Sequence, residues 1–244
     1  MKNKIVALII VTAALLTITH SAFAMNELID TNQAKLLKTL AQDYGWKVEG
    51  NYTTEHLNTI LKGGLSIENY ISHLTGEDGQ AWIKNYLGNA VFHLDGKVIN
   101  AAYQLNIRGF VFPNTDIYLP NKFTAFVVVH ELGHVLDNNI GGDKPAVWFG
   151  GGAADQMLAD LGGHPEKRAF PHCVDSTDYI STMAGPESWP VYMNGGKNPA
   201  DDFADTFLVA VVGEELPVPN VLQLAPRRLG WMDAYVITLT ATLP

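Results

Sequence analysis

The sequence predicts an α+β fold in which a small mixed sheet packs on one central helix. Residues 26–88 carry apolar side chains at helical spacing, and residues 90–119 change to short β-prone runs. Residues 122–138 then form a longer apolar segment without the strict alternation of a strand. We therefore expect a helical N-terminal region, a sheet, a buried helix and a C-terminal helical part, in that order.

Within the N-terminal region, apolar spacing and punctuation predict three helices. The first begins near Asn26, and the second follows Thr53 or Thr54 and ends at Gly63-Gly64. Ser66 is the predicted N-cap of the third helix.

Four short β-prone runs predict the sheet, at residues 90–94, 97–103, 109–112 and 116–119. Turn residues separate these runs from one another. The last run, "DIYL", is a candidate for the sheet edge on which an extended peptide pairs, although the sequence does not show which strand is the edge.

The chain after the sheet alternates between helical and irregular character. Three consecutive valines weaken the helix propensity of residues 122–138, so packing must hold that helix. A short helix is expected at residues 153–161, an irregular segment at 162–197, and a helix at 199–212. Helical character returns after Pro226.

The first 24 residues have the pattern of a secretory signal peptide. Lys2 and Lys4 precede an apolar run of residues 5–18, and Ala22-Phe23-Ala24 is a small-x-small cleavage site. A run of this length is shorter than the ~20 residues that span a bilayer. We expect cleavage after Ala24, a secreted or periplasmic product, and no stable membrane insertion after cleavage.

The composition narrows the classes of partner. Removal of residues 1–24, with two lysines and no acid, moves the formal charge from −9 to −11, which argues against nucleic acid as a partner. Cys173 is the only cysteine, so no intrachain disulfide can form. The sequence leaves the oligomeric state open.

The stretch "VVVHELGHVLD" contains two histidines four residues apart, with a glutamate after the first. On a helix, His130 and His134 share one face and can bind one zinc ion, while Glu131 can act as general base on a zinc-bound water. The alternative is a buried helix whose histidines make ordinary core hydrogen bonds. His56, His73 and His93 lie in regions without candidate supporting ligands.

The segment "NPADDFADTF" contains the candidates for a third metal ligand. Pro199 starts a predicted helix that places Asp201 and Asp205 on one face, so that one carboxylate can bind the metal and the other can orient a ligand histidine. Asp202 is the rival for the ligand role. Acids in a first helical turn are also favoured by the helix dipole whatever their function.

These two motifs together resemble the gluzincin zinc metallopeptidases, most of all the catalytic domain of anthrax lethal factor and its relatives. The resemblance covers about residues 107–212 and implies a zincin-like domain at 89–244, after a signal peptide at 1–24 and a helical region at 25–88. The third ligand is Asp here, where the family usually has Glu.

The resemblance also implies a role for each matching residue. It makes Asp201 the third zinc ligand and Asp205 its support, and Tyr192 the tyrosine that assists the transition state, with Tyr179 as a fallback. The function it implies is an exported zinc-dependent endopeptidase acting on peptides or proteins. The alternatives are a non-catalytic secreted binding or adhesion protein with a structural or lost metal site, and a toxin-like effector protease with one host target.

Overall fold

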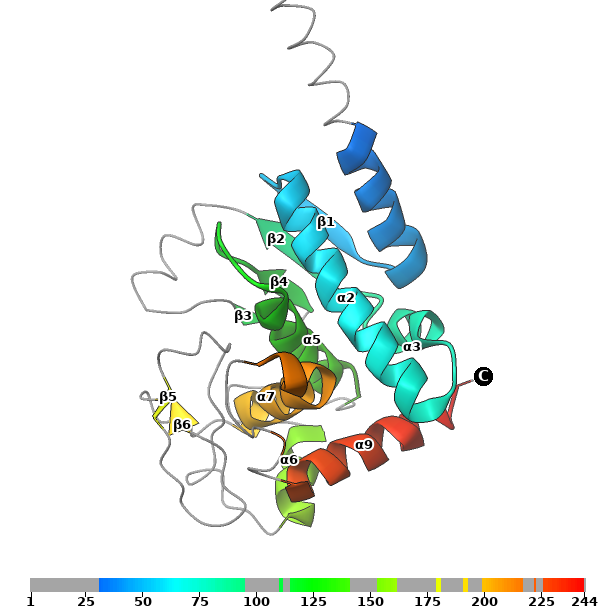
Figure 1. Ribbon diagram of the computed structural model, residues 1–244, viewed down its shortest axis with the longest axis vertical. Coiled ribbons are helices and arrows are strands. Elements are labelled where there is room, and N and C mark those ends of the chain that lie inside the picture. The colour runs from blue at the N-terminus through cyan, green and yellow to red at the C-terminus, as the bar shows by residue number, and fades with distance from the viewer. Residues whose placement is uncertain are drawn as a thin grey trace, which may run out of the picture.

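The computed structural model describes residues 31–94, 110–111, 115–140, 153–161, 179–180, 191–192, 199–216, 222 and 226–243. These residues form an α+β structure of packed helices and a small sheet, which confirms the predicted fold class (Figure 1). The predicted signal peptide, the predicted strand at 97–103 and Cys173 lie outside the described residues. None of the described helices has both the length and the apolar character needed to cross a bilayer.

The main sheet has four strands in the order β1-β2-β4-β3. These strands are β1 (Lys47–Gly50), β2 (Val91–Leu94), β3 (Phe110–Val111) and β4 (Asp116–Tyr118). β1 and β4 both run parallel to β2, whereas β3 runs antiparallel to β4. The expectation that "DIYL" forms the sheet edge is therefore wrong, because β4 pairs on both sides.

The first strand lies inside the region predicted to be wholly helical. The first helix, residues 31–39, continues into a π-helical turn, η1 (Leu40–Tyr44), and Gly45 ends it with φ of 79°. The chain can then extend and pair β1 with β2, beginning with Lys47 N–H donating to Ala90 O. Four residues carry too little alternation to reveal this strand from sequence.

Helix α2 (Thr54–Thr75) is one continuous helix, so the predicted break at Gly63-Gly64 is wrong. A Cβ on Gly63 would lie 2.7 Å from a Val128 methyl, and one on Gly64 would lie 2.9 Å from the Tyr44 ring. The glycines thus let neighbouring elements approach the helix closely, and this packing offsets their cost of roughly 1 kcal/mol each. The helix begins after Thr53 as expected, with the Thr53 side chain accepting from His56 N–H.

Ser66 is also not an N-cap. It lies within α2, where its hydroxyl donates to the Lys62 carbonyl one turn earlier. Serine can satisfy itself this way in a helix interior, which is why its presence does not by itself mark a helix start. A separate short helix, α3 (Gly79–Tyr86), starts further on at its N-cap Asp78.

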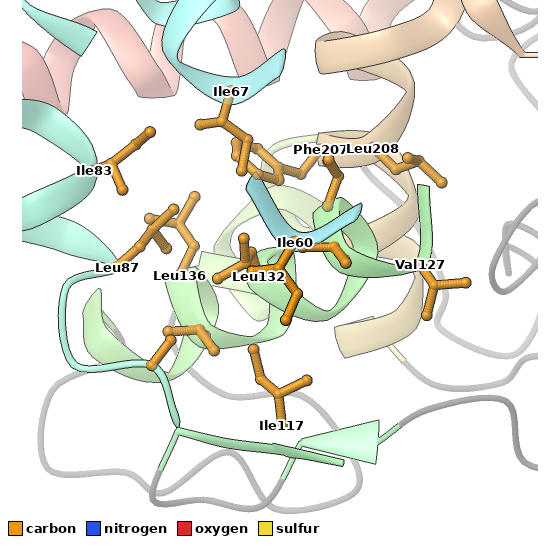
Figure 2. Close-up of a cluster of buried hydrophobic side chains, with 14 of the residues drawn as sticks. Ile60, Ile67, Ile83, Leu87, Ile117, Val127, Leu132, Leu136, Phe207 and Leu208 are labelled. Carbon is orange, nitrogen blue, oxygen red and sulfur yellow. The ribbon is translucent and has the colours of Figure 1, made fainter. Parts of the chain in front are cut away.

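Helix α5 (Ala125–Ile140) runs through the core and confirms the predicted central helix. Its valines 127–129 are all buried, so packing supports a segment of low helix propensity. Figure 2 shows side chains from α2, β4 and α7 gathered around Leu132 and Leu136 of α5. The core holds residues from both sides of the domain boundary predicted at residue 88.

The remaining helices follow the predicted order. They are α6 (Ala153–Asp160), α7 (Pro199–Val212), the short η3 (Gly213–Glu215) and α9 (Pro226–Thr240). Helix α7 packs on α5, and both α6 and α9 pack on α7 (Figure 1).

The segment expected to be irregular contains a small ladder. Strands β5 (Tyr179–Ile180) and β6 (Val191–Tyr192) pair antiparallel. The prediction of irregular structure at 162–197 is therefore wrong at these four residues. Each strand has only two residues, which is too short for an alternation of apolar and polar side chains to appear in the sequence.

Candidate metal centre

Helix α5 brings the two motif histidines together. Their Nε2 atoms lie 3.2 Å apart, and the rings meet edge to face with centroids at 4.8 Å. Together with Glu131, they form a group whose potential ligand atoms all lie within 4.8 Å of one another. His130 and Glu131 are each 1% exposed. The described residues thus contain a group that could hold a metal ion, as the motif predicts.

The distance between the two nitrogens fits a tetrahedral ion. Zinc–nitrogen bonds of about 2.0–2.1 Å at a tetrahedral angle place two ligand nitrogens about 3.3 Å apart. The 3.2 Å separation between His130 and His134 matches this value, and it is also the length of an N–H···N hydrogen bond between the two rings. Two buried carboxyl groups, Glu131 and Asp205, lie nearby, and a cation would compensate their charge when they are ionised.

Asp205 on α7 contacts the first histidine from the other side. Its Oδ1 lies 2.7 Å from His130 Nδ1, and the two side chains are 0% and 2% exposed. A carboxylate this close favours the imidazole tautomer with its proton on Nδ1, which leaves the Nε2 lone pair available for a metal. Asp205 therefore contacts the first motif histidine, and its role in orienting a zinc ligand stays a prediction.

Two small residues allow this contact. Gly133 of α5 faces Ala204 of α7, and a Cβ on Gly133 would lie 2.8 Å from the Ala204 Cα. The two helices cross closely at this point, one residue before Asp205 and three residues after His130. The glycine of "HELGH" and the alanine of "DDFAD" thus set the separation of the helices that carry the two motifs.

The predicted third ligand lies on the same helix as Asp205. Asp201 is four residues before Asp205 in α7, one turn closer to the N-terminus. Asp202, its rival, is the next residue along the helix. The side chains of both lie outside the described part of the structure, so the choice between them stays a prediction.

The two candidate tyrosines are register partners. Tyr192 of β6 pairs directly with Tyr179 of β5 across the small ladder. Their side chains are outside the described part as well, and their predicted role in catalysis stays a prediction. The pairing does show that the preferred residue and its fallback belong to one local structure.

Asp137, the last residue of "HELGHVLD", has a structural role that the motif does not reveal. Its side chain is 1% exposed, and its Oδ1 accepts a hydrogen bond of 2.9 Å from Ala154 N at the start of α6. Asp137 thus ties the end of the motif helix to α6. Its signal in the sequence is an acid on a buried helix ahead of a glycine-rich loop and a new helix.

His93 has supporting carboxylates that were not expected. Its Nε2 lies 3.0 Å from Asp116 on β4, and its Nδ1 lies 3.6 Å from Glu49 on β1. Parallel register places Glu49 beside His93 on the neighbouring strand, and only the sheet pairing reveals this. This cluster links three strands, but it is not a second metal group among the described residues.

No protein-family model matches the chain, and no curated protein matches it. The description of the site therefore rests on its residues and geometry.

Proposed function

We propose that this protein is an exported zinc-dependent endopeptidase of the gluzincin type, with a zincin-like catalytic domain. One observation carries the proposal: the histidine pair with metal-ligand spacing has a buried carboxylate from a distant helix 2.7 Å from Nδ1 of its first ring. Metal-binding histidines commonly have both features, because a carboxylate on the second nitrogen orients the ring and raises its basicity.

Asp201 completes the proposed ligand set. His130 on α5 contacts Asp205 on α7, and further along α5 Gly133 contacts the preceding residue, Ala204. Asp201 lies one turn before Asp205 on the same face of α7. We expect its carboxylate to reach the ion held by His130 and His134.

Zinc at this site would supply a Lewis acid that polarises both a water molecule and the peptide carbonyl. Glu131, adjacent to the first ligand, accepts the proton of the attacking water and passes it to the leaving amine. Tyr192 donates a hydrogen bond to the oxyanion that forms during the attack. Asp205 keeps the His130 ring fixed while the charge around it changes.

A peptide that extends the sheet would add to β3. β4 is internal, and β3 is the neighbouring strand at the outer side of the described sheet. Main-chain hydrogen bonds to such a strand would bind an extended peptide without regard to its side chains. The net negative charge agrees with a peptide substrate and not with nucleic acid.

Metal analysis combined with a peptide-library digest tests this function. The purified protein should contain about one zinc per chain and cleave peptides, whereas Glu131→Gln should retain zinc and lose cleavage. Tightly bound zinc without any Glu131-dependent cleavage would sink the peptidase proposal and favour a binding protein with a structural metal. Cleavage of a single protein and of no peptide in the library would identify the effector-type protease.

A further inference from the structure

Helix α7 packs against α5, α6, α2 and the C-terminal helix α9. Successive residues of a helix are about 100° apart, so Phe203 and Asp205 point in nearly opposite directions. Asp205 contacts His130 of α5, whereas Phe203 contacts α9. The rotation of α7 about its own axis therefore depends on both contacts.

Three rings form the contact between the two helices, Phe203 from α7 and Trp231 and Tyr235 from α9. We refer to these three residues as the aromatic brace. The Trp231 and Tyr235 rings stack at 4.7 Å with an interplanar angle of 16°. Phe203, which is 0% exposed, meets both rings edge to face, at 6.3 Å from Trp231 and 6.1 Å from Tyr235. Edge-to-face pairs have a preferred geometry, so they define an orientation as well as burying area.

Helix α9 is itself fastened to other elements, so the brace rests on a fixed support. Trp231 Nε1 donates to Asp160 of α6 at 2.9 Å. The Tyr70 hydroxyl of α2 donates to Asp233 at 2.7 Å, and the Tyr86 hydroxyl of α3 donates to the Leu239 carbonyl at 2.6 Å. These contacts hold α9 along most of its length.

We propose that Trp231 and Tyr235 are positioning residues of the metal centre, which act through Phe203 to fix the rotation of α7. This inference rests on the proposed function, because it assigns these residues to the same zinc site. Neither residue touches the metal group. Their effect reaches it through Asp205 on His130, and through Asp201 on the same face of α7.

A small rotation is enough to matter. Side-chain atoms lie about 5 Å from a helix axis, so a rotation of about 20° displaces them by nearly 2 Å. Such a shift would break the 2.7 Å contact between Asp205 and His130. Loss of a carboxylate that orients a ligand histidine typically lowers metal affinity by about 10–100-fold.

The test compares Trp231→Leu and Tyr235→Leu with Trp231→Phe and Tyr235→Phe. Zinc affinity is measured by competition with a chromophoric chelator, and the Co²⁺-substituted site is followed by its visible absorption spectrum. We expect the leucine variants to lose about tenfold in zinc affinity and to change the Co²⁺ spectrum. Tyr235→Phe, which keeps the ring, should stay within about twofold of the parent protein. Trp231→Phe keeps a ring but loses the hydrogen bond to Asp160, so its zinc affinity should lie between those of Trp231→Leu and the parent.

Tyr86→Phe is the matched control for general loosening of α9. It removes the hydrogen bonds of the Tyr86 hydroxyl with Leu239 and Thr242 and leaves the three rings of the brace in place. We expect it to lower Tm while leaving zinc affinity unchanged. Parent-like affinity in both leucine variants would overturn the inference, as would a loss in Tyr86→Phe equal to theirs.

A readout that needs no metal separates this inference from the proposed function. In the metal-free protein, the Nδ1 proton of His130 should give a slowly exchanging NMR signal, retained in Tyr235→Phe and lost in Tyr235→Leu. If the parent protein binds zinc but cleaves nothing, the peptidase function fails and zinc affinity still decides the brace. If the parent protein binds no zinc, both the proposed function and the assignment of Trp231 and Tyr235 to a metal centre fail. This holds even if the His130 signal is retained in Tyr235→Phe and lost in Tyr235→Leu.

Discussion

Gly133 of α5 lies against Ala204 of α7 so closely that a Cβ on the glycine would come within 2.8 Å of the alanine Cα. The obstacle would be backbone and not the end of a flexible side chain, so the helices would have to move apart. Gly133 lies between His130 and His134 along α5, and Ala204 directly precedes Asp205 on α7. The separation of the two helices at the metal centre therefore depends on the absence of a side chain at Gly133.

Replacement of Gly133 by Ala should both destabilise the protein and weaken the metal site. Overpacking of this kind typically costs about 1–3 kcal/mol. Urea unfolding and zinc content measure the two effects. Gly230→Ala on α9 is the control, because a Cβ there meets nothing within 4 Å, and it should stabilise by roughly 0.5–1 kcal/mol. A Gly133→Ala protein as stable as the parent would show that the helices are free to separate.

Asp205→Asn should lower zinc affinity by about 10–100-fold while preserving side-chain volume. The amide carries no negative charge, so it no longer favours the His130 tautomer that presents Nε2 to the metal. Chelator competition gives the affinity, and circular dichroism checks the fold. Unchanged affinity in Asp205→Asn would mean that the carboxylate serves only the packing of α7.

Asp201→Ala and Asp202→Ala, made separately, decide the third ligand. We expect Asp201→Ala to empty the site and Asp202→Ala to keep its zinc, because Asp201 shares the helix face of Asp205. Zinc content after dialysis is the measurement. Equal zinc content in the two variants contradicts the assignment.

Asp137→Ala should destabilise α6. The Asp137 carboxylate accepts from the Ala154 amide at the start of that helix, and removal of such a cap costs about 0.5–2 kcal/mol. Hydrogen exchange of the Ala154 amide should speed up more than exchange in the α2 core. Exchange that is unchanged at Ala154 would mean that another group takes over the amide.

Tyr70→Phe should make stability less sensitive to alkaline pH. Burial, followed by the hydrogen bond to Asp233, raises the pKa of Tyr70 well above its usual value. The folded state thus keeps a proton that the unfolded state releases above about pH 10, so stability is full below that pH and falls as pH rises. Each such tyrosine contributes a slope of about 1.4 kcal/mol per pH unit there.

Urea unfolding at a series of pH values up to about 11 gives the slope. Burial also raises the pKa values of Tyr44 and Tyr235, so Tyr70→Phe should reduce the alkaline loss without abolishing it. An identical slope in Tyr70→Phe and the parent would show that folding does not change the pKa of Tyr70.

The sequence by itself determined the features that depend on local spacing. The period of a helix places His130 and His134 on one face, and Pro199 marks the start of α7. Both are properties of a few neighbouring residues, so no knowledge of the rest of the chain is needed.

Only the tertiary structure decided which distant residues meet. Gly63 and Gly64 look like a helix end, yet they lie inside α2 because Val128, Tyr44 and Trp46 pack against them. β1 exists because β2 pairs with it, and His93 gains its carboxylates in the same way. The contact of Asp205 with His130 requires α5 and α7 to cross at Gly133 and Ala204, and such a crossing is set by shape complementarity over the whole core, which no local pattern encodes.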